Sequence, residues 1–451
     1  MMKHWLLVLI CLVYSGGVWS APVKNVIWVI GDGMGPEILG FWMQGARYAQ
    51  LKNVPVSHTE KLMNKATWGL YFNNTYDTIV TDSAASATQM ATGKFSRPLF
   101  IGLDYQKKSV PNLLEIARKH GKAVGVVTDA YVTDATPAGF TAHVEARQQH
   151  NEIAAQQIKF GPEVILGGGL KYFNRDENKD LLQVAQQKGY QIVQDKEQLA
   201  QVKKGKVLGL FADKGMPLAV EMHDYPTLPS LTDMARSAIT LLEQDKDGFV
   251  LMVEAGKIDW AAHANDPGAV WAEMKAFDAL IGFLVEYVDK HPQTLLYINA
   301  DHDTGLGAFT YRHVGKEKAK QLAAQGEMLY GGDTDYASFK AYEAFDKQQR
   351  SLDSTFKLLK KVPPEKRTKK LLQQSLSDAL GYPVDMDQFA DWTDWEGVFK
   401  QLNSRWGMSY ATRSHSAAPL LSIAYGTGAQ AFGGVYHNTE ILPRLRTVLE
   451  W

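Results

Sequence analysis

The sequence predicts an α/β fold in which a mostly parallel central sheet is covered by helices on both faces, as a three-layer sandwich. Short runs rich in β-branched and apolar residues alternate with stretches of helical periodicity, which is typical of parallel sheets. The runs lie at residues 25–30, 123–128, 163–166, 206–210, 249–253, 294–298 and 420–425. In such sheets the active site gathers at the carboxyl ends of the strands, so residues that follow these runs are the first candidates for function.

Helical patterns occupy the spaces between the β-rich runs. One is expected at 109–120, with Ser109 as its N-cap and Pro111 in its first turn. Two further helices are expected at 231–244 and at about 267–289.

A long segment at about 308–412 interrupts the alternation of runs and helices. It spans about a hundred residues with helical periodicity, which is too long for an ordinary loop. Three of its aromatic residues are Trp392, Trp395 and Trp406. We expect a helical insertion that covers the rim of the active site or a dimer interface, so a homodimer is one assembly to consider.

The charge and the N-terminus limit the partners and the location of the protein. With 48 Lys and Arg against 49 Asp and Glu, the chain has no basic field for nucleic acid or for an anionic membrane. Residues 1–20 have the layout of a secretory signal peptide, with one cation, a short apolar run and small residues before Ser20. We expect cleavage after Ser20, or after Ala21, and a catalytic domain at 21–451 that is periplasmic or secreted and has no membrane anchor. The only cysteine, Cys11, would leave with the signal peptide.

Side chains that commonly bind metals lie at the ends of several β-rich runs. A single Asp-x-x-x-His pair is usually a solvated helix face, and a lone Gly-Asp-Gly is usually a turn. Four segments with such ligands at strand ends are much harder to explain in that way. Imidazole together with carboxylate suits Zn²⁺, and oxygen ligands alone suit Mg²⁺. The candidates are Asp32, Glu254, Asp259, His263, Asp301, His302 and His415.

The segment 81–94 (TDSAASATQMATGK) places Ser83 at the expected start of a helix. The N-terminus of a helix offers backbone donors to an anion, although an alanine-rich buried helix would show the same pattern. A serine hydroxyl needs a base or a metal to take its proton, and no histidine lies near Ser83 in the sequence, which points to a metal. Further along, Asp134 and Thr136 offer oxygen ligands, and Arg147 offers a guanidinium for phosphate. We expect His143 to be a packed or surface residue.

These segments together resemble the alkaline phosphatase family from residue 21 to the C-terminus, apart from the insertion. The matching motifs, in order, are IGDGMG, TDSAASAT, DATPA, VEAGKIDWAAH, ADH and SHSAAP. The resemblance is to exported bacterial members, and Trp260 directly after Asp259 is similar to marine-type ones. It implies the fold of that family and hydrolysis of small phosphate monoesters through a phosphoserine on Ser83.

The resemblance also implies two Zn²⁺ ions and one Mg²⁺ ion, and it assigns their ligands. The first Zn²⁺ would bind Asp259, His263 and His415, and the second would bind Asp32, Asp301, His302 and Ser83. Asp32, Thr136 and Glu254 would hold Mg²⁺, with Asp134 acting through water. Arg147 would bind the phosphate oxygens, and Trp260 would line the substrate site without the charge that a lysine brings there in other members.

Two other functions are compatible with these residues. A phosphodiesterase of the same superfamily could use the same pair of metals. A non-catalytic phosphate- or metal-binding protein could share the fold, because fold alone does not give function. The Cys/Ser-x-Pro-x-Arg motif of sulfatases is absent.

Overall fold

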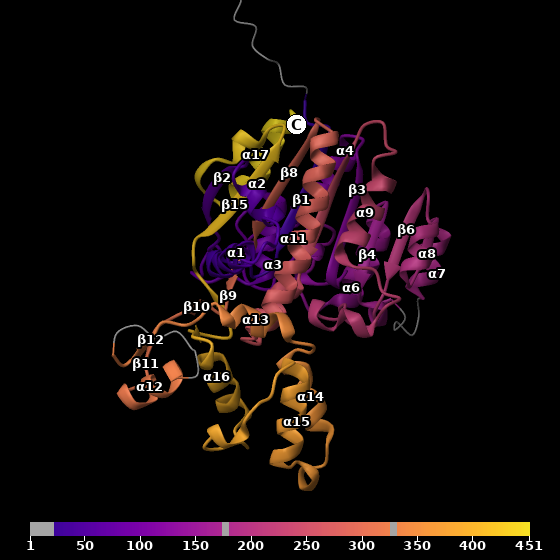
Figure 1. Ribbon diagram of the computed structural model, residues 1–451. Coiled ribbons are helices and arrows are strands. Elements are labelled where there is room, and N and C mark those ends of the chain that lie inside the picture. The colour runs from indigo at the N-terminus through magenta and orange to yellow at the C-terminus, as the bar shows by residue number, and fades with distance from the viewer. Residues whose placement is uncertain (1–21, 174–179, 325–331) are drawn as a thin grey trace, which may run out of the picture.

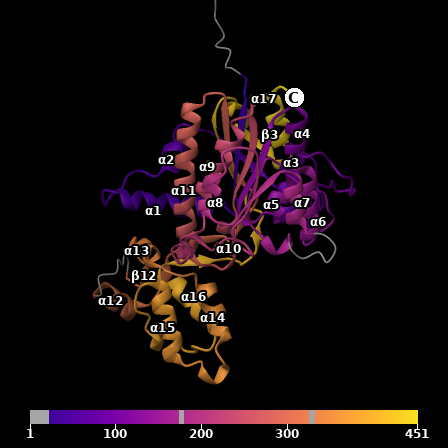
Figure 2. The same ribbon diagram turned by 90° about the vertical axis from the view of Figure 1, so that its right-hand side faces the viewer.

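A ten-stranded sheet runs through the centre of the protein, with helices on both faces (Figures 1 and 2). The computed structural model describes residues 22–173, 180–324 and 332–451, so the predicted signal peptide at 1–20 lies outside the described residues. The predicted three-layer α/β fold is confirmed. In sheet order the strands are β16 (Gly434–His437), β2 (Thr67–Phe72), β15 (Leu420–Gly426), β8 (Thr294–Ala300), β1 (Asn25–Gly31), β7 (Phe249–Ala255), β3 (Ala123–Tyr131), β4 (Val164–Gly168), β6 (Lys206–Leu210) and β5 (Tyr190–Val193).

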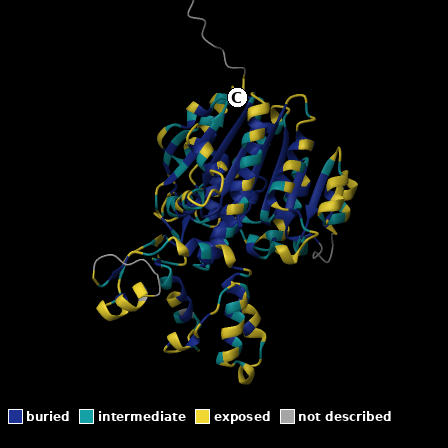
Figure 3. Cartoon of the chain, viewed as in Figure 1, coloured by how far each residue is buried: buried dark blue, intermediate teal, exposed yellow. Residues whose placement is uncertain are grey.

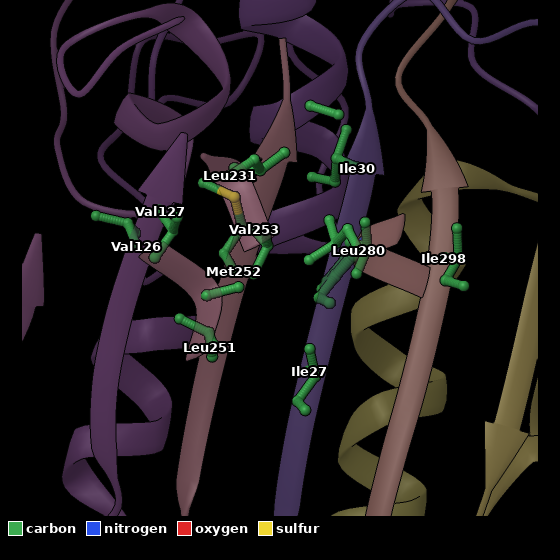
Figure 4. Packing of buried hydrophobic residues seen from close by; sticks show 14 of the residues in the cluster. Ile27, Ile30, Val126, Val127, Leu231, Leu251, Met252, Val253, Leu280 and Ile298 are labelled. Carbon is green, nitrogen blue, oxygen red and sulfur yellow. The ribbon is translucent and has the colours of Figure 1, made fainter. Parts of the chain in front are cut away.

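The sheet is parallel except at β15, which is antiparallel to both β8 and β2. The seven predicted β-rich runs correspond to β1, β3, β4, β6, β7, β8 and β15. All residues of β7 and β8 are buried, because helices cover both faces of the sheet. Figure 3 shows this buried sheet between exposed helix surfaces, and Figure 4 shows Ile27, Met252 and Leu280 among the packed side chains.

The helices divide between the two faces of the sheet (Figure 2). The longest, α11 (Pro267–Lys290), and its neighbour α9 (Leu231–Leu242) confirm the helices predicted at 267–289 and 231–244. On their face lie also α1 (Pro36–Gln50), α2 (His58–Met63) and α8 (Lys196–Gln201). The other face carries α3 (Ser83–Thr92), α4 (Leu113–Lys119), α5 (Ala135–Gly139), α6 (His150–Phe160), α7 (Leu181–Gln187) and α17 (Ile441–Leu449).

The predicted start of the helix at 109–120 is wrong. Helix α4 begins at Leu113, where Asn112 and Glu115 form a capping box. Ser109 instead pairs with Leu103 in an isolated β-bridge. The residue before a proline disfavours the helical region, so the segment that leads to Pro111 stays extended. The edge strands β5 and β16, and β2 next to β16, were also not predicted, because each is partly exposed.

The long segment expected at 308–412 extends from the end of the sheet at which β8 finishes (Figure 1). Its base is closed by β10 (Gly307–Phe309), which pairs antiparallel with β13 (Met408–Tyr410). A second short pair joins β11 (Arg312–His313) to β12 (Thr334–Asp335). The helices of the segment are α12 (Lys316–Ala324), α13 (Lys340–Lys347), α14 (Leu352–Lys361), α15 (Lys369–Leu380) and α16 (Trp395–Arg405).

The helices of this segment pack against two different apolar clusters. Helix α13 joins the main core, where the Tyr342 ring lies 5.3 Å from that of Phe41. Helices α14, α15 and α16 instead enclose a separate apolar cluster, in which Trp395 stacks on Phe356 at 5.1 Å. The part with its own core is therefore 352–405, which is shorter than the predicted segment. Among the described residues, no helix has the length and apolar character needed to cross a membrane.

Asp266, the N-cap of α11, connects this second cluster to the main body. Its carboxylate is fully buried and accepts hydrogen bonds from the backbone N–H groups of Ala269 (3.0 Å) and Leu352 (2.7 Å). It also accepts from the side-chain amide of Gln348. One carboxylate therefore holds the first turn of α11 and the first turn of α14 together.

We predict that Asp266→Ala releases α14 to α16 from the main body. Buried donors would be left without an acceptor, each costing about 1–3 kcal/mol, and every 1.4 kcal/mol raises the open population about tenfold. Limited proteolysis should cut within 348–362 at least about tenfold faster than in the unmodified protein. The matched control is Asp278→Ala on the same helix, which removes the acceptor for the N–H groups of His58 and Thr59 instead. Equal cleavage of the two variants in that region would contradict the prediction.

Candidate metal centre and active site

The predicted metal ligands meet at the carboxyl ends of three neighbouring central strands. Asp32 follows β1, Glu254 lies near the end of β7, and Asp301 follows β8. The register places Gly31 beside both Ala255 and Ala300, so the residues at these strand ends are brought side by side. The parallel sheet thus gathers carboxylates that are far apart in the sequence.

Ser83 is the first residue of α3 and is only 3% exposed. Asp82 caps this helix by accepting a hydrogen bond from the N–H of Ala85 at 3.0 Å. The Ser83 hydroxyl lies 3.0 Å from His302 Nε2 and accepts a hydrogen bond from Arg147 Nη1 at 3.4 Å. No histidine lies near this serine in the sequence, but the fold brings His302 next to it from the turn after β8. The hydroxyl therefore faces an imidazole, a guanidinium and the positive end of a helix.

Asp259, His263 and His415 form one compact group, whose ligand atoms all lie within 4.8 Å of one another. Asp259 and His263 share a face of α10 (Lys257–His263), and His415 belongs to β14 (His415–Ser416), which pairs with β9 (Asp303–Thr304). The two Nε2 atoms are 3.2 Å apart, and Asp259 Oδ2 lies 3.4 Å from that of His263.

The outer nitrogens of these two histidines fix how the imidazoles are protonated. His263 Nδ1 lies 2.5 Å from the carbonyl oxygen of Arg413, and His415 Nδ1 lies 3.1 Å from that of Thr81. A carbonyl only accepts, so each Nδ1 carries the proton and donates it. The two Nε2 atoms then face each other at 3.2 Å, a distance at which they cannot both carry a hydrogen. A cation between them resolves this contact, so these residues fit a metal ion.

A second group surrounds His302 Nε2. It lies 3.5 Å from Asp32 Oδ1 and 3.2 Å from Asp301 Oδ2, in addition to its contact with Ser83. Both carboxylate oxygens are buried and have no hydrogen-bond donor among the described residues. Thr304, which was not singled out from the sequence, donates to Asp259 Oδ1 at 2.6 Å and lies 3.2 Å from His302 Nδ1, so it links the two groups.

The electrostatics of this second group favour a cation. Burial, and then the charges of Asp301 and Asp259, raise the pKa of Asp32 well above its ordinary value. Burial also raises the pKa of Asp301 to about 6 and lowers that of His302 well below its usual range. Burial disfavours the ionised form of these carboxylates, and a divalent ion bound between them and the neutral imidazole would stabilise that form.

The third predicted group has only oxygen atoms. Glu254 is 1% exposed and accepts a short hydrogen bond from the Thr128 hydroxyl, while the Thr136 hydroxyl is buried without a partner among the described residues. Burial, followed by the charge of Asp134, raises the pKa of Glu254 to about 8. An unpartnered hydroxyl beside buried carboxylates fits a hard cation.

Arg147 connects this oxygen-rich group to Ser83. Its Nη2 donates to Asp134 Oδ1 at 3.1 Å, while its Nη1 faces Ser83 and lies 3.6 Å from Asp82 Oδ2. Asp134 and Asp82 thus hold the guanidinium beside Ser83, the candidate nucleophile.

His143 lies apart from this site. Its ring is hydrogen-bonded to the Gly102 carbonyl and to Glu115, which confirms that it is a packed residue.

Comparison with known proteins identifies the family of this chain. The family model for alkaline phosphatase matches residues 23–451. The chain belongs to the alkaline phosphatase family. It is 33% identical over 428 residues to alkaline phosphatase 4 of Bacillus subtilis, which covers 93% of this chain and 87% of that protein. It is 32% identical over 337 residues to the alkaline phosphatase of Escherichia coli, over 62% of this chain and 70% of that one.

Solved structures of the family have the same fold. The alkaline phosphatase of Thermus thermophilus matches with a TM-score of 0.81 and 25% identity, covering 97% of this chain and 94% of that one. A cold-active alkaline phosphatase from Shewanella sp. matches with a TM-score of 0.77 and 28% identity, covering 94% and 99%. The enzyme is therefore a phosphatase, and its family implies divalent metal ions and small phosphate monoesters as substrates.

We predict that removal of divalent metals destabilises the enzyme more at pH 8 than at pH 6.5. The folded-state pKa of Glu254, about 8, lies above its ordinary value of 4.5, so the metal-free folded protein binds more protons than the unfolded chain. Its stability must then fall as the pH rises toward 8, whereas a bound cation favours the ionised carboxylates throughout.

Thermal unfolding of chelated and metal-loaded protein at several pH values between 6.5 and 8 measures this difference. Buried acids away from the metal ligands, such as Glu273, titrate in both samples and cancel in the comparison. We expect the difference in midpoint to widen with pH. A difference that stays constant or narrows would contradict the prediction.

Proposed function

We propose that the enzyme hydrolyses phosphate monoesters through a phosphoserine on Ser83, with two Zn²⁺ ions and one Mg²⁺ ion. The position of the Ser83 hydroxyl carries this proposal. It lies at the buried start of α3, between His302 Nε2 and the Arg147 guanidinium. A phosphate group bound there would meet a nucleophile, a bidentate cation and a helix N-terminus together.

The reaction then runs in two displacements at phosphorus. In the first, Ser83 Oγ forms a bond to phosphorus while the bond to the leaving alcohol breaks, and the alcohol gains a proton in balance with the one that the serine loses. In the second, water attacks phosphorus, the bond to Ser83 Oγ breaks, inorganic phosphate is released, and the serine regains its proton. Arg147 binds phosphate oxygens during both steps, and Asp134 holds its guanidinium in place.

The metal ligands are assigned from the family resemblance, and their chemistry fits that assignment. When bound, the cations stabilise negative charge on the entering and leaving oxygens. Imidazoles beside carboxylates suit zinc, and a group with only oxygen atoms suits magnesium. One Zn²⁺ is assigned to Asp259, His263 and His415, the other to Asp32, Asp301, His302 and Ser83, and Mg²⁺ to Asp32, Thr136 and Glu254, with Asp134 through water.

The remaining assignments concern location and the surroundings of the site. Residues 1–20 are assigned as a signal peptide, so that the enzyme acts in the periplasm or outside the cell. Trp260 is assigned to the substrate-binding side of α10, next to Asp259. The segment at 308–412 is assigned to the rim of the site or to the interface of a homodimer, since it extends from the end of the sheet that carries the ligands (Figure 1).

We predict that Ser83→Ala abolishes the phosphoenzyme and lowers kcat about 10³-fold or more, because no other hydroxyl has the same contacts with His302 and Arg147 in the described structure. Acid quenching with radiolabelled substrate followed by peptide mapping detects the intermediate. The matched control is Ser86→Ala, one turn further along α3, where the hydroxyl donates to the Asp301 carbonyl. The control should still form a phosphoenzyme. A trapped phosphoenzyme in the Ser83→Ala protein would refute the assignment.

We predict that Glu254→Gln weakens Mg²⁺ binding and lowers turnover, while the histidine-containing sites keep their zinc. The substitution removes one negative charge from a group of hard oxygen ligands and leaves Asp259, His263 and His415 unchanged. Metal analysis of both proteins, together with activity with and without added Mg²⁺, provides the test. Unmodified enzyme with three zinc ions and no magnesium would overturn the assignment, as would a variant with unaltered magnesium dependence.

A further inference from the structure

A buried lysine lies directly behind the candidate substrate site. Lys257 is the first residue of α10 and is only 2% exposed, which is unusual for a lysine. Its Nζ lies 3.3 Å from the centre of the Trp260 ring, one helical turn later. The backbone at Gly215 covers both groups, because a Cβ added there would lie 2.8 Å from Nζ and 2.8 Å from the indole. The amine is thus enclosed between an aromatic face and the chain.

Carboxylates on two neighbouring elements surround this amine. Asp129 on β3 accepts hydrogen bonds from the N–H groups of Gly256 (2.7 Å) and Lys257 (3.1 Å), which fixes the start of α10. Glu273 on α11 is buried and accepts from the N–H of Ala219 at 2.6 Å. The position of Nζ over the indole face is one that a cation favours, and the charge of Asp129 favours the protonated amine as well.

A short series of contacts leads from this cation to the guanidinium proposed to bind phosphate. The Trp260 ring also lies 5.6 Å from the ring of Tyr131, which is in the last position of β3. The carbonyl of Tyr131 accepts a hydrogen bond from the N–H of Asp134 at 2.9 Å, and Asp134 in turn holds Arg147. A change at Lys257 would reach Asp134 both through Trp260 and through the local electric field, since charges interact strongly in a buried environment.

We propose that Lys257 is a positioning residue for phosphate binding, which holds Trp260 against Tyr131 and offsets the negative charge of the carboxylates behind Asp134. The sequence suggested that Trp260 leaves this side of the site without a cation, whereas the structure places one beneath its ring. The inference rests on the proposed function, in which phosphate binds at Arg147. Loss of the amine would remove a positive charge that favours ionised Asp129 and Asp134 next to an anionic ligand.

The test is Lys257→Met in metal-loaded enzyme at pH 7. We expect the Ki of inorganic phosphate and the KM of p-nitrophenyl phosphate to rise by about 3- to 10-fold, the size expected for losing one nearby buried charge, while kcat changes less. Lys257→Arg should bring both constants back to within about twofold of the unmodified enzyme, because a guanidinium also stacks on indole. If Lys257→Met does not fold, Lys257→Gln takes its place, and we expect the same rise in Ki and KM.

Lys206→Met is the matched control. Lys206 is also partly buried, lies 5.5 Å from the Tyr190 ring and donates to the Gly161 carbonyl, but it is in the first position of β6, at the opposite end of the sheet. Its loss should leave the Ki of phosphate unchanged, whereas a purely structural effect at Lys257 would lower stability without moving Ki. The proposal fails if Lys257→Met leaves Ki and KM unchanged, if Lys206→Met raises them equally, or if the rise accompanies loss of metal.

The test of Lys257 can be distinguished from the test of the phosphoserine mechanism. If the enzyme forms no phosphoserine, the proposed mechanism falls, but the Kd of inorganic phosphate measured by calorimetry still tests Lys257. A Kd that rises in Lys257→Met and recovers in Lys257→Arg would uphold the positioning role in that case. An unchanged Kd would overturn it.

Discussion

The burial of several carboxylates at one end of the sheet is the constraint on which the rest of this structure depends. Asp32, Glu254 and Asp301 follow or end three adjacent central strands, and each has a pKa raised by desolvation. Ionised groups in such surroundings are costly unless a cation is present. The register of the sheet alone forces this arrangement, because it fixes which residues emerge beside one another.

The helices around these strands supply the remaining side chains of the site. Helix α3 presents its N-terminus and Ser83 to the same point, and α10 presents Asp259 and His263 from a single face. Close packing permits this: a Cβ at Gly139 would lie 2.9 Å from that of Ala87, so α5 sits directly against α3. The small residues in the segment around Ser83 therefore belong to the site as much as the serine does, because they let Thr136 and Asp134 approach it.

The sequence predicted the central strands, and it singled out the candidate metal ligands that lie together at their ends, because both have strong local signals. Strands buried on both faces are continuous apolar runs, and the ligands follow them directly. The partners that orient the ligands have no such signal. The carbonyls of Thr81 and Arg413 could be found only from the fold, because backbone groups are the same in every residue. The approach of His302 to Ser83, across 219 residues, has no local signal either and was implied only by the family resemblance, which gives both residues to one zinc ion. The start of α4 was missed, because an extended segment before Pro111 displaces the cap to Asn112.

The contact of His263 with the Arg413 carbonyl joins the metal centre to the long segment that β10 and β13 close. The chain directly after β13 is itself fixed to the loop after β9, since Thr412 donates to the Gly305 carbonyl and Gly305 donates to that of Ser414. The same stretch therefore ends the segment and fixes which nitrogen of His263, a proposed metal ligand, carries the proton. A ligand held by its outer nitrogen is more basic and better oriented. It follows that ordering of this segment and retention of the metal proposed at Asp259, His263 and His415 are linked, so a change in either one alters the other.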